Sequence, residues 1–422
     1  MSEPLISISR KQALIFAFFL VLYEFLTYIA NDMIMPGMIQ VVKSFNAPES
    51  TVATSLTIYI LGGASLQLIL GPISDAYGRR PLMLIGAAIF CFFTILIANA
   101  HSMDQFLTSR FFQGMGLCFI SVIGYATIQE MFEEMDAIRL ISIMANAAIL
   151  APLLGPLLGA IVIHYTSWRV IFIMIAVSSL FVLWGLWHYM PEPIGQITKK
   201  GKVIPKVPFA PRFILKNYKA LLTNKTFCFS TLAIGLVGIP CVSWIALAPV
   251  ILITEGKLTA IQYGLWQLPV FSATIIGNWI LHQLTYRYSI KTILYLGCIV
   301  LAIGTSLMTI LPYFYGNHYY YLLPGVIAYF FALSIINAPL NRFCLFITTV
   351  SKGTASAIIS LSVMIIGAIG IEIANICYSQ HSNLVFGLYS NGVIVLFLLF
   401  MGLALWTDTF HFSDPKSHSE IK

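Results

Sequence analysis

The sequence predicts an all-α membrane protein with twelve transmembrane helices in two six-helix bundles. Hydrophobic residues make up 59% of the 422 and charged residues only 9%, whereas a soluble domain carries about 25% charged residues. Apolar runs of about 20 residues, long enough to cross a bilayer, occur twelve times. One long polar segment separates the first six runs from the last six.

Each apolar run is expected to form a helix, because an open strand edge in lipid would leave backbone groups unpaired. The predicted spans cover residues 12–38, 50–71, 81–99, 103–128, 138–164, 168–190, 226–254, 259–284, 290–313, 319–347, 352–378 and 384–407. The first run is too long for a signal-peptide core and no small-residue cleavage site follows it. We therefore expect it to remain as a span.

The polar segment sets the predicted domains: residues 1–190 as the N-terminal bundle, 191–225 as a cytoplasmic linker and 226–422 as the C-terminal bundle. The two halves show weak internal similarity. The loop after span two reads GPISDAYGRRPLMLIG, and the loop after span eight reads LTYRYSIKTILYLG, which keeps Arg287 and Lys291 but lacks the glycines and the aspartate. Many transporters are built from such repeats, with their sites at the midplane between the halves.

The basic residues fix the expected orientation. With the N-terminus in the cytoplasm, the inside loops and tails hold nineteen of the 23 Lys and Arg residues, the outside loops hold Lys43, Arg169 and Lys257, and Arg110 lies within a span. This asymmetry follows the positive-inside rule. We expect a multi-pass protein of the cytoplasmic (inner) membrane with both termini cytoplasmic, and we do not expect nucleic acid as a partner.

The sequence contains few of the motifs that are typical of enzymes. The seven cysteines lie within predicted spans, no pair has metal-ligand spacing, and the eight histidines are scattered. A Gly-x-x-x-x-Gly-Lys-Ser/Thr phosphate-binding loop is also missing. We therefore expect neither an enzyme nor a metal site, and no cofactor apart from a proton as the coupling ion.

Two carboxylates, Glu24 and Asp32, lie inside the first span. Ionisable residues at bilayer depth are costly and usually mark ion or substrate pathways. At 100° per residue, Tyr28 and Asn31 lie on the same broad helix face as the two acids. Burial favours the protonated form of a carboxyl and a nearby arginine favours the ionised form. We expect Glu24 to take up a proton more easily and Asp32 to depend on Arg110; the alternative is that one acid is a buried structural hydrogen bonder.

The loop after span two carries the most specific motif. Glycine, aspartate, glycine and two arginines occur at Gly71, Asp75, Gly78, Arg79 and Arg80. This spacing resembles the signature loop of the major facilitator superfamily and implies that fold. The resemblance implies a charge latch between helix ends that favours one conformation. Glu130 is either the partner of this latch or a solvated member of the acidic run 130–136.

Span four contains Arg110 followed by Gln113 and Gly114, which resembles another motif of the superfamily. Arg110 lies about 10 Å from the outer end of its span, at a depth similar to that of Asp32. Pairing of the two is geometrically possible and would make a proton-linked switch. The alternative is a structural arginine that bonds carbonyl groups of neighbouring spans.

Span five reads APLLGPLLGA from residue 151, with Pro152, Gly155, Pro156 and Gly159. Pro156 is expected to kink the helix, and the two glycines form a small-residue face for tight packing. The pattern resembles the antiporter motif of the superfamily. The alternative is ordinary packing of membrane helices.

The stretch LYEFLTYIANDMIMPGM in span one is similar to the MdfA-type multidrug/proton antiporters of the drug/proton antiporter branch. Further segments fit this resemblance over nearly the whole chain: 124–130, 144–152, 262–269, 351–354 and 370–373. The resemblance implies that Glu24 and Asp32 carry proton coupling, and the motif in span four adds Arg110 to this group. The residues that it implies for substrate binding are Glu24, Tyr28, Asn31, Asp32, Met144, Asn146, Ala148 and Ile245.

The function expected from this resemblance is proton-coupled efflux of lipophilic cationic and neutral drugs by alternating access. The expected partners are small-molecule drugs, protons and the lipid bilayer. The expected working form is a monomer. The alternative is a proton-coupled symporter or facilitator for a small metabolite on the same fold. Glu372 is a lesser candidate, which we interpret as a hydrated glutamate near the outer end of span eleven.

Overall fold

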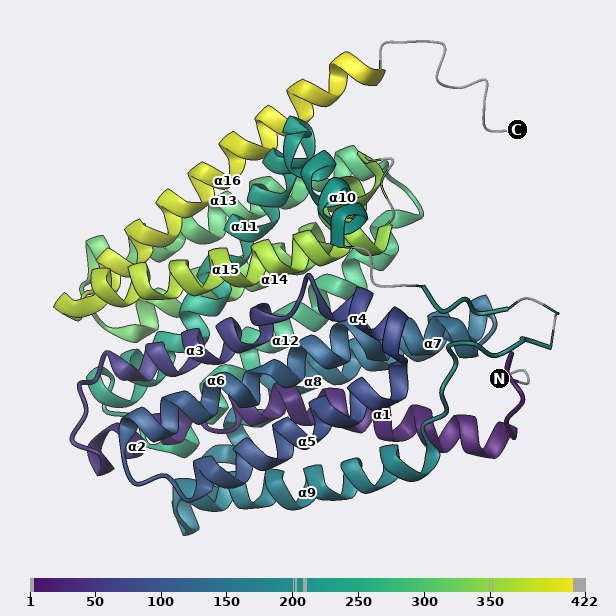
Figure 1. Ribbon diagram of the computed structural model, residues 1–422. Coiled ribbons are helices and arrows are strands. Elements are labelled where there is room, and N and C mark those ends of the chain that lie inside the picture. The colour runs from purple at the N-terminus through teal and green to yellow at the C-terminus, as the bar shows by residue number, and fades with distance from the viewer. Residues whose placement is uncertain are drawn as a thin grey trace. The chain divides into compact units, whose positions relative to one another are not determined.

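The computed structural model describes residues 4–199, 201, 203–207, 211–348, 350 and 352–412 (Figure 1). Within these ranges the regular elements are helices, apart from one antiparallel bridge between Ile197 and Val203. The chain forms two compact units. The first unit comprises Met1–Ala210 with Ile245–Leu268, and the second comprises Pro211–Trp244 with Pro269–Lys422.

The helices up to residue 190 lie in the first unit. They are α1 (Arg10–Asp32), η1 (Met35–Gly37), α2 (Met38–Ser44), α3 (Thr51–Ser65), α4 (Leu70–Tyr77), α5 (Arg79–Ala98), α6 (Met103–Phe119), the π-helical turn η2 (Ile120–Gly124), α7 (Tyr125–Met131), α8 (Glu134–Tyr165) and α9 (Trp168–Tyr189).

The remaining helices follow the polar segment. They are α10 (Pro211–Thr223), α11 (Lys225–Pro249), the π-helical turn η3 (Val250–Glu255), α12 (Ala260–Thr285), α13 (Ile290–Tyr315), α14 (Tyr319–Phe346), α15 (Lys352–Cys377), η4 (Tyr378–Gln380) and α16 (Asn383–Phe412). The division between the units passes through α11 and α12.

Every predicted span corresponds to a helix or to a run of consecutive helices. In the described part of the chain, ten helical stretches are long and apolar enough to cross a membrane. The other two predicted spans correspond to α3 with the start of α4, where the helix is interrupted at residues 66–69, and to α12. The predicted domain boundaries at residues 190 and 226 stay a prediction. Within the predicted linker, α10 is an additional helix.

Local sequence explains several helix ends. Ser9 accepts a hydrogen bond from the Gln12 amide and Ser102 accepts one from the Gln105 amide, so serine side chains cap α1 and α6. α1 ends at Asp32, shortly before Pro36, whose ring cannot continue an α-helix.

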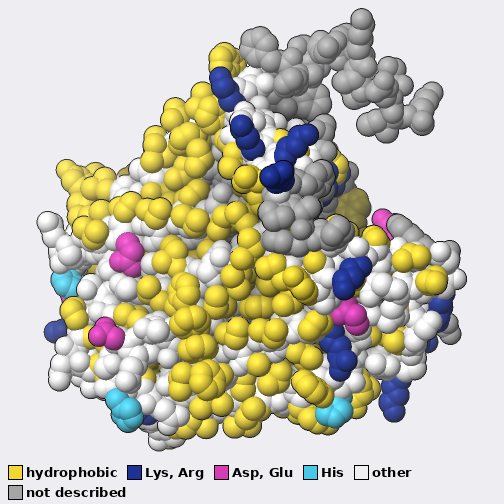
Figure 2. Space-filling model, in the orientation of Figure 1, with side chains coloured by type: hydrophobic (Ala, Val, Ile, Leu, Met, Phe, Trp, Pro, Cys, Tyr) yellow, Lys and Arg dark blue, Asp and Glu magenta, His cyan; other side chains and the backbone are white. Residues whose placement is uncertain are grey.

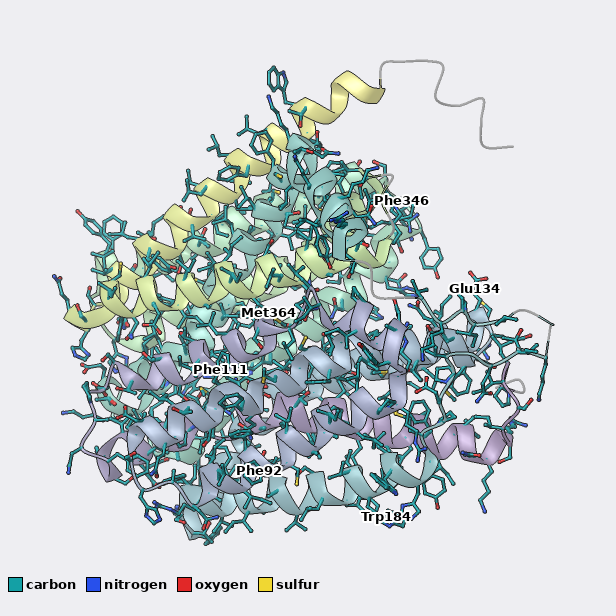
Figure 3. All side chains as sticks on the ribbon, viewed as in Figure 1. Phe92, Phe111, Glu134, Trp184, Phe346 and Met364 are labelled. Carbon is teal, nitrogen blue, oxygen red and sulfur yellow. The ribbon has the colours of Figure 1, made fainter. Side chains whose placement is uncertain are left out.

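In the first unit, α1 packs against α8 and α9, α5 packs between α6 and α9, and α3 packs against α6. In the second unit, α13 packs against α14 and α16. Hydrophobic side chains cover much of the visible surface, whereas Lys and Arg side chains gather in a few places (Figure 2). Large exposed side chains such as Phe92 and Trp184 (Figure 3) belong to this apolar surface. An apolar surface of this extent suits contact with lipid rather than water.

Candidate functional site

Glu24 is buried in α1, with only 2% of its surface exposed. Its Oε1 accepts a 2.8 Å hydrogen bond from the hydroxyl group of Tyr125. Its Oε2 has no hydrogen-bond partner among the described residues. Tyr125 begins α7 directly after the π-helical turn η2, and such turns are frequent at functional sites. One carboxyl oxygen is thus held in place and the other is open to a proton or a ligand.

Asp32, the last residue of α1, is also buried. Its Oδ1 accepts a hydrogen bond of 3.3 Å from Nδ2 of the neighbouring Asn31. The Asn31 side chain therefore presents its amide nitrogen to the carboxyl group and keeps its amide oxygen for another donor.

That donor is Arg110 of α6, which is completely buried. Its Nη2 donates to Asn31 Oδ1 over 2.7 Å, and its Nη1 donates to Gln113 Oε1 over 2.8 Å. A longer bond of 3.4 Å joins Nη1 to the Ala30 carbonyl. The guanidinium group also lies over the ring of Tyr59, 4.4 Å from its centroid.

The possible pairing of Arg110 with Asp32 is therefore indirect. The described residues contain no ion pair between them, and Asn31 forms hydrogen bonds with both. We call this arrangement the Asn31 bridge. The buried guanidinium is surrounded by neutral oxygens and an aromatic face, so any change in charge at Asp32 alters the electrostatic balance around Arg110.

Sequence reasoning missed the residues that support this bridge. Tyr59 of α3 hydrogen-bonds to the Thr27 carbonyl of α1, and Thr94 of α5 accepts a 2.8 Å bond from Gln113. Each comes from a different helix, so spacing along the sequence contains no signal for them. Tyr125 lies in a segment that fits the family resemblance, and its role as the partner of Glu24 appears only in three dimensions.

The antiporter motif packs directly against the end of α1. A Cβ added at Gly159 would lie 1.8 Å from the Met33 carbonyl oxygen, and one at Gly155 would lie 2.9 Å from the Asp32 Cβ. Only glycine permits so close an approach between two backbones. α8 continues as one helix through Pro152 and Pro156. The motif therefore determines how closely α8 approaches Asp32.

Arg79 lies at the centre of the signature loop and is buried. Its Nη2 is 2.6 Å from Asp75 Oδ1 and 2.7 Å from Glu130 Oε1. Its Nε adds a second bond, of 3.2 Å, to Glu130, and its Nη1 bonds to the Ser74 hydroxyl. Of the two interpretations of Glu130, the one that pairs it with the loop agrees with this geometry. Arg80 bonds instead to the Trp187 carbonyl at the end of α9.

Glu192, which sequence reasoning missed, caps the start of α5. Its carboxylate accepts hydrogen bonds of 3.0 Å and 2.9 Å from the backbone amides of Arg79 and Arg80. Gly78 has a positive φ of 110°, and a Cβ there would meet Glu192 Oε2 at 2.5 Å. Gly78 is thus needed both for its conformation and for space, whereas Gly71 meets no such constraint. Arg79 and Glu192 are 113 positions apart in the sequence, which explains why no local motif revealed the contact.

The residues implied to line a drug cavity differ in exposure. Tyr28 and Ala148 are half-buried, Met144 is completely buried, and Asn146 is exposed. On α8, Asn146 is about 200° around the helix from Met144 and Ala148 is about 40° from it. Met144 and Ala148 therefore share a side of α8 that Asn146 does not. Ile245 of α11 is half-buried, and its role as part of a binding wall stays a prediction.

Glu372 lies on α15 of the second unit and is half-buried. The described residues contain no group of three or more His, Cys, Asp or Glu side chains that would suit a metal ion. Ion pairs among the described residues of the first unit join Arg79 to Asp75 and Glu130, and Arg139 to Asp136.

Comparison with known proteins identifies relatives of this chain. Residues 20–371 match the family model of the Major Facilitator Superfamily. The chain is 41% identical over 395 residues, 94% of both chains, to the multidrug transporter MdfA of Yersinia pestis strain Angola. It is 40% identical over 391 residues to the multidrug transporter MdfA of Escherichia coli O6:H1, covering 92% of this chain and 93% of that one.

Solved structures share the fold at low identity. A crystal structure of a D-xylose-proton symporter aligns with a TM-score of 0.69 and 15% identity, over 91% of this chain and 97% of that one. A bacterial homologue of the human lysosomal transporter Spinster, inward-facing and occupied, aligns with a TM-score of 0.70 and 11% identity, over 95% of this chain and 98% of that one. The chain thus has the twelve-helix fold of a transporter rather than an enzyme, and it belongs to the major facilitator superfamily.

Proposed function

We propose that this protein is a proton-coupled multidrug efflux antiporter of the cytoplasmic (inner) membrane, with both termini in the cytoplasm. Its cargo would be lipophilic cationic and neutral compounds, and it would work as a monomer with the proton as its only coupling ion. The relatives with 40–41% identity over nearly the full length are multidrug transporters, which supports the substrate class.

The Asn31 bridge is the observation that carries the coupling. Two buried carboxyl groups lie on α1, and one of them is linked through a single amide to a buried guanidinium. Protonation of Asp32 would remove a negative charge next to the amide that binds Arg110. Gly155 and Gly159 bring α8 against the same end of α1. A shift in the bridge would therefore change the packing of both α1 and α8.

The cycle follows from linkage between proton and substrate. Facing outward, Glu24 or Asp32 takes up a proton and the drug leaves. Facing inward, drug binding favours release of that proton, and the helix bundles then return. Each proton that moves inward releases about 2.3 kcal/mol per 100 mV of membrane potential, in addition to the pH gradient.

The Arg79 cluster would act as a latch for one conformation. Its ion pairs join the end of α4, the start of α5 and the end of α7. Breaking a partly buried, bidentate arginine–carboxylate pair costs more than breaking an exposed one. The latch therefore holds these three helix ends together until the cycle opens it.

A susceptibility panel in cells without their own drug pumps tests the proposal. Expression should raise resistance to lipophilic drugs, and a proton uncoupler should abolish the effect. In proteoliposomes, an imposed pH gradient should drive drug against the proton flow, and the E24Q variant should lose this coupling for some substrates. Drug movement in the same direction as protons would favour the symporter, and unaltered pumping of every substrate by E24Q would contradict the role of Glu24.

A further inference from the structure

The helix α10 has three distinct sides. At 100° per residue, Ile214, Tyr218 and Leu221 share one side. Leu221 is completely buried and the other two are half-buried, and α10 packs against α15 of the same unit. This side attaches the helix to the protein.

The second side of α10 is apolar and exposed. Leu215 and Leu222 lie about 20° apart around the helix, and 69% and 62% of their surfaces are exposed. Two leucines this exposed on one helix side favour an apolar environment over water.

The third side is basic. Arg212, Lys216 and Lys219 fall within about 60° of one another, beside the two leucines, and all three are exposed. Between Glu192 and Glu255 the sequence contains eight basic residues and no acidic ones. Lys and Arg side chains gather in the region of α10 in Figure 2. The third side is therefore not neutralised by acidic residues of its own segment.

The end of α10 is fixed to the start of α11. The side chain of Asn224 caps α11 by accepting a 3.1 Å bond from the Phe227 amide, and the Cys228 thiol donates to the Leu222 carbonyl over 3.2 Å. α11 is one of the helices long enough to cross a membrane. α10 thus ends where a membrane span begins.

We propose that α10 lies in the membrane interface and binds anionic phospholipid headgroups. Leu215 and Leu222 would enter the acyl region, and the three basic side chains would reach the phosphate groups beside them. Lys and Arg next to an apolar helix side place their charges at the headgroup level in this way. Anionic lipid attracts such residues by about fivefold in affinity for each charge near the surface.

The test uses the full-length protein in nanodiscs of phosphatidylcholine, with and without about one quarter phosphatidylglycerol. Hydrogen exchange of residues 211–223 should slow when phosphatidylglycerol is present, and high salt should reverse the effect. Native mass spectrometry of protein titrated with phosphatidylglycerol should show retention weakened by about tenfold to a hundredfold in the R212Q/K216Q/K219Q variant.

A matched variant, R10Q/K11Q/K206Q, removes three exposed charges from the first unit and should retain the lipid as the wild type does. Equal retention by both triple variants would overturn the proposal.

L215Q/L222Q tests the apolar side separately and should also weaken retention. Two other outcomes would overturn the proposal: displacement of the lipid by free glycerol phosphate at equal concentration, which indicates a soluble-anion site, and exchange protection that requires a protein partner.

Discussion

Asn31 Oδ1 accepts a 2.7 Å hydrogen bond from Arg110 Nη2, and both residues are buried. The same Asn31 side chain donates to Asp32, so one amide group forms the contact between the buried cation and the Asp32 carboxyl. This relationship gives Asn31 an electrostatic role in addition to the drug contact implied by the family resemblance.

Replacing Asn31 with alanine should therefore destabilise the protein and weaken coupling. Arg110 would lose a charge-assisted bond worth about 2 kcal/mol, and Asp32 would lose its side-chain donor. Thermal unfolding in detergent and proton-driven drug transport measure the two effects. The control is N99A, which removes an exposed side chain that bonds only within its own helix and should change stability by less than about 0.5 kcal/mol. Equal effects of the two variants would contradict the role of the bridge.

Binding of a cationic drug should depend on pH through Glu24. At low pH the carboxyl is protonated and cannot neutralise the cation, so binding tightens as pH rises. For one competing proton the affinity changes by up to about tenfold per pH unit. The E24Q variant should show a shallower dependence, whereas Y125F, which retains the carboxyl, should keep the wild-type slope. An unchanged slope in E24Q, measured by equilibrium dialysis, would argue against this carboxyl.

Much of this architecture follows from the sequence. Apolar runs predicted every span, because the bilayer demands a minimum length of apolar helix. The interruption of the helix at residues 66–69 was not predicted. The sequence there, GGASLQLILG, is largely apolar and fits a continuous span. The helix α10 was missed because its basic residues gave the segment the composition of a loop.

Site residues were predictable where the residue type alone, an ionisable side chain in an apolar run, indicates a functional position. Glu24, Asp32 and Arg110 stand out because ionisable groups are rare in apolar runs. The contact of Asn31 with Arg110 and the contact of Glu192 with Arg79 do not stand out, since they join residues 79 and 113 positions apart. Such contacts depend on how helices pack, which no local pattern in a single sequence specifies.

The close contact between Gly159 and Met33 predicts a strong effect of a single methyl group. A Cβ at Gly159 would lie 1.8 Å from the Met33 carbonyl oxygen, so G159A must push α8 away from α1. Overpacking of this kind costs about 1–3 kcal/mol, and coupling should fall because Asp32 adjoins the contact. The matched control is G392A on α16, where a Cβ meets nothing within 4 Å. Equal thermal stability of the two variants would show that the helices separate without cost.

Glu130 should matter more than the neighbouring Glu134. Glu130 pairs with Arg79 through two bonds, whereas Glu134 is exposed at the start of α8 (Figure 3). E130Q weakens a partly buried ion pair and should slow drug transport several-fold. E134Q removes the same charge four residues away and should transport at the wild-type rate. Similar transport by both variants in proteoliposomes would support the alternative of a solvated acidic run.

Glu192 should stabilise the latch from the backbone side. Its carboxylate satisfies two amides at the start of α5, and loss of such a cap costs about 1 kcal/mol. E192A should lower the unfolding temperature and the transport rate, and E192Q, which keeps an acceptor oxygen, should recover part of both. Because Glu192 and Glu130 hold the backbone and the side chain of Arg79, the E192A/E130Q double variant should lose less than the sum of the single losses. Strict additivity of the two losses would mean that the cap and the ion pair act independently.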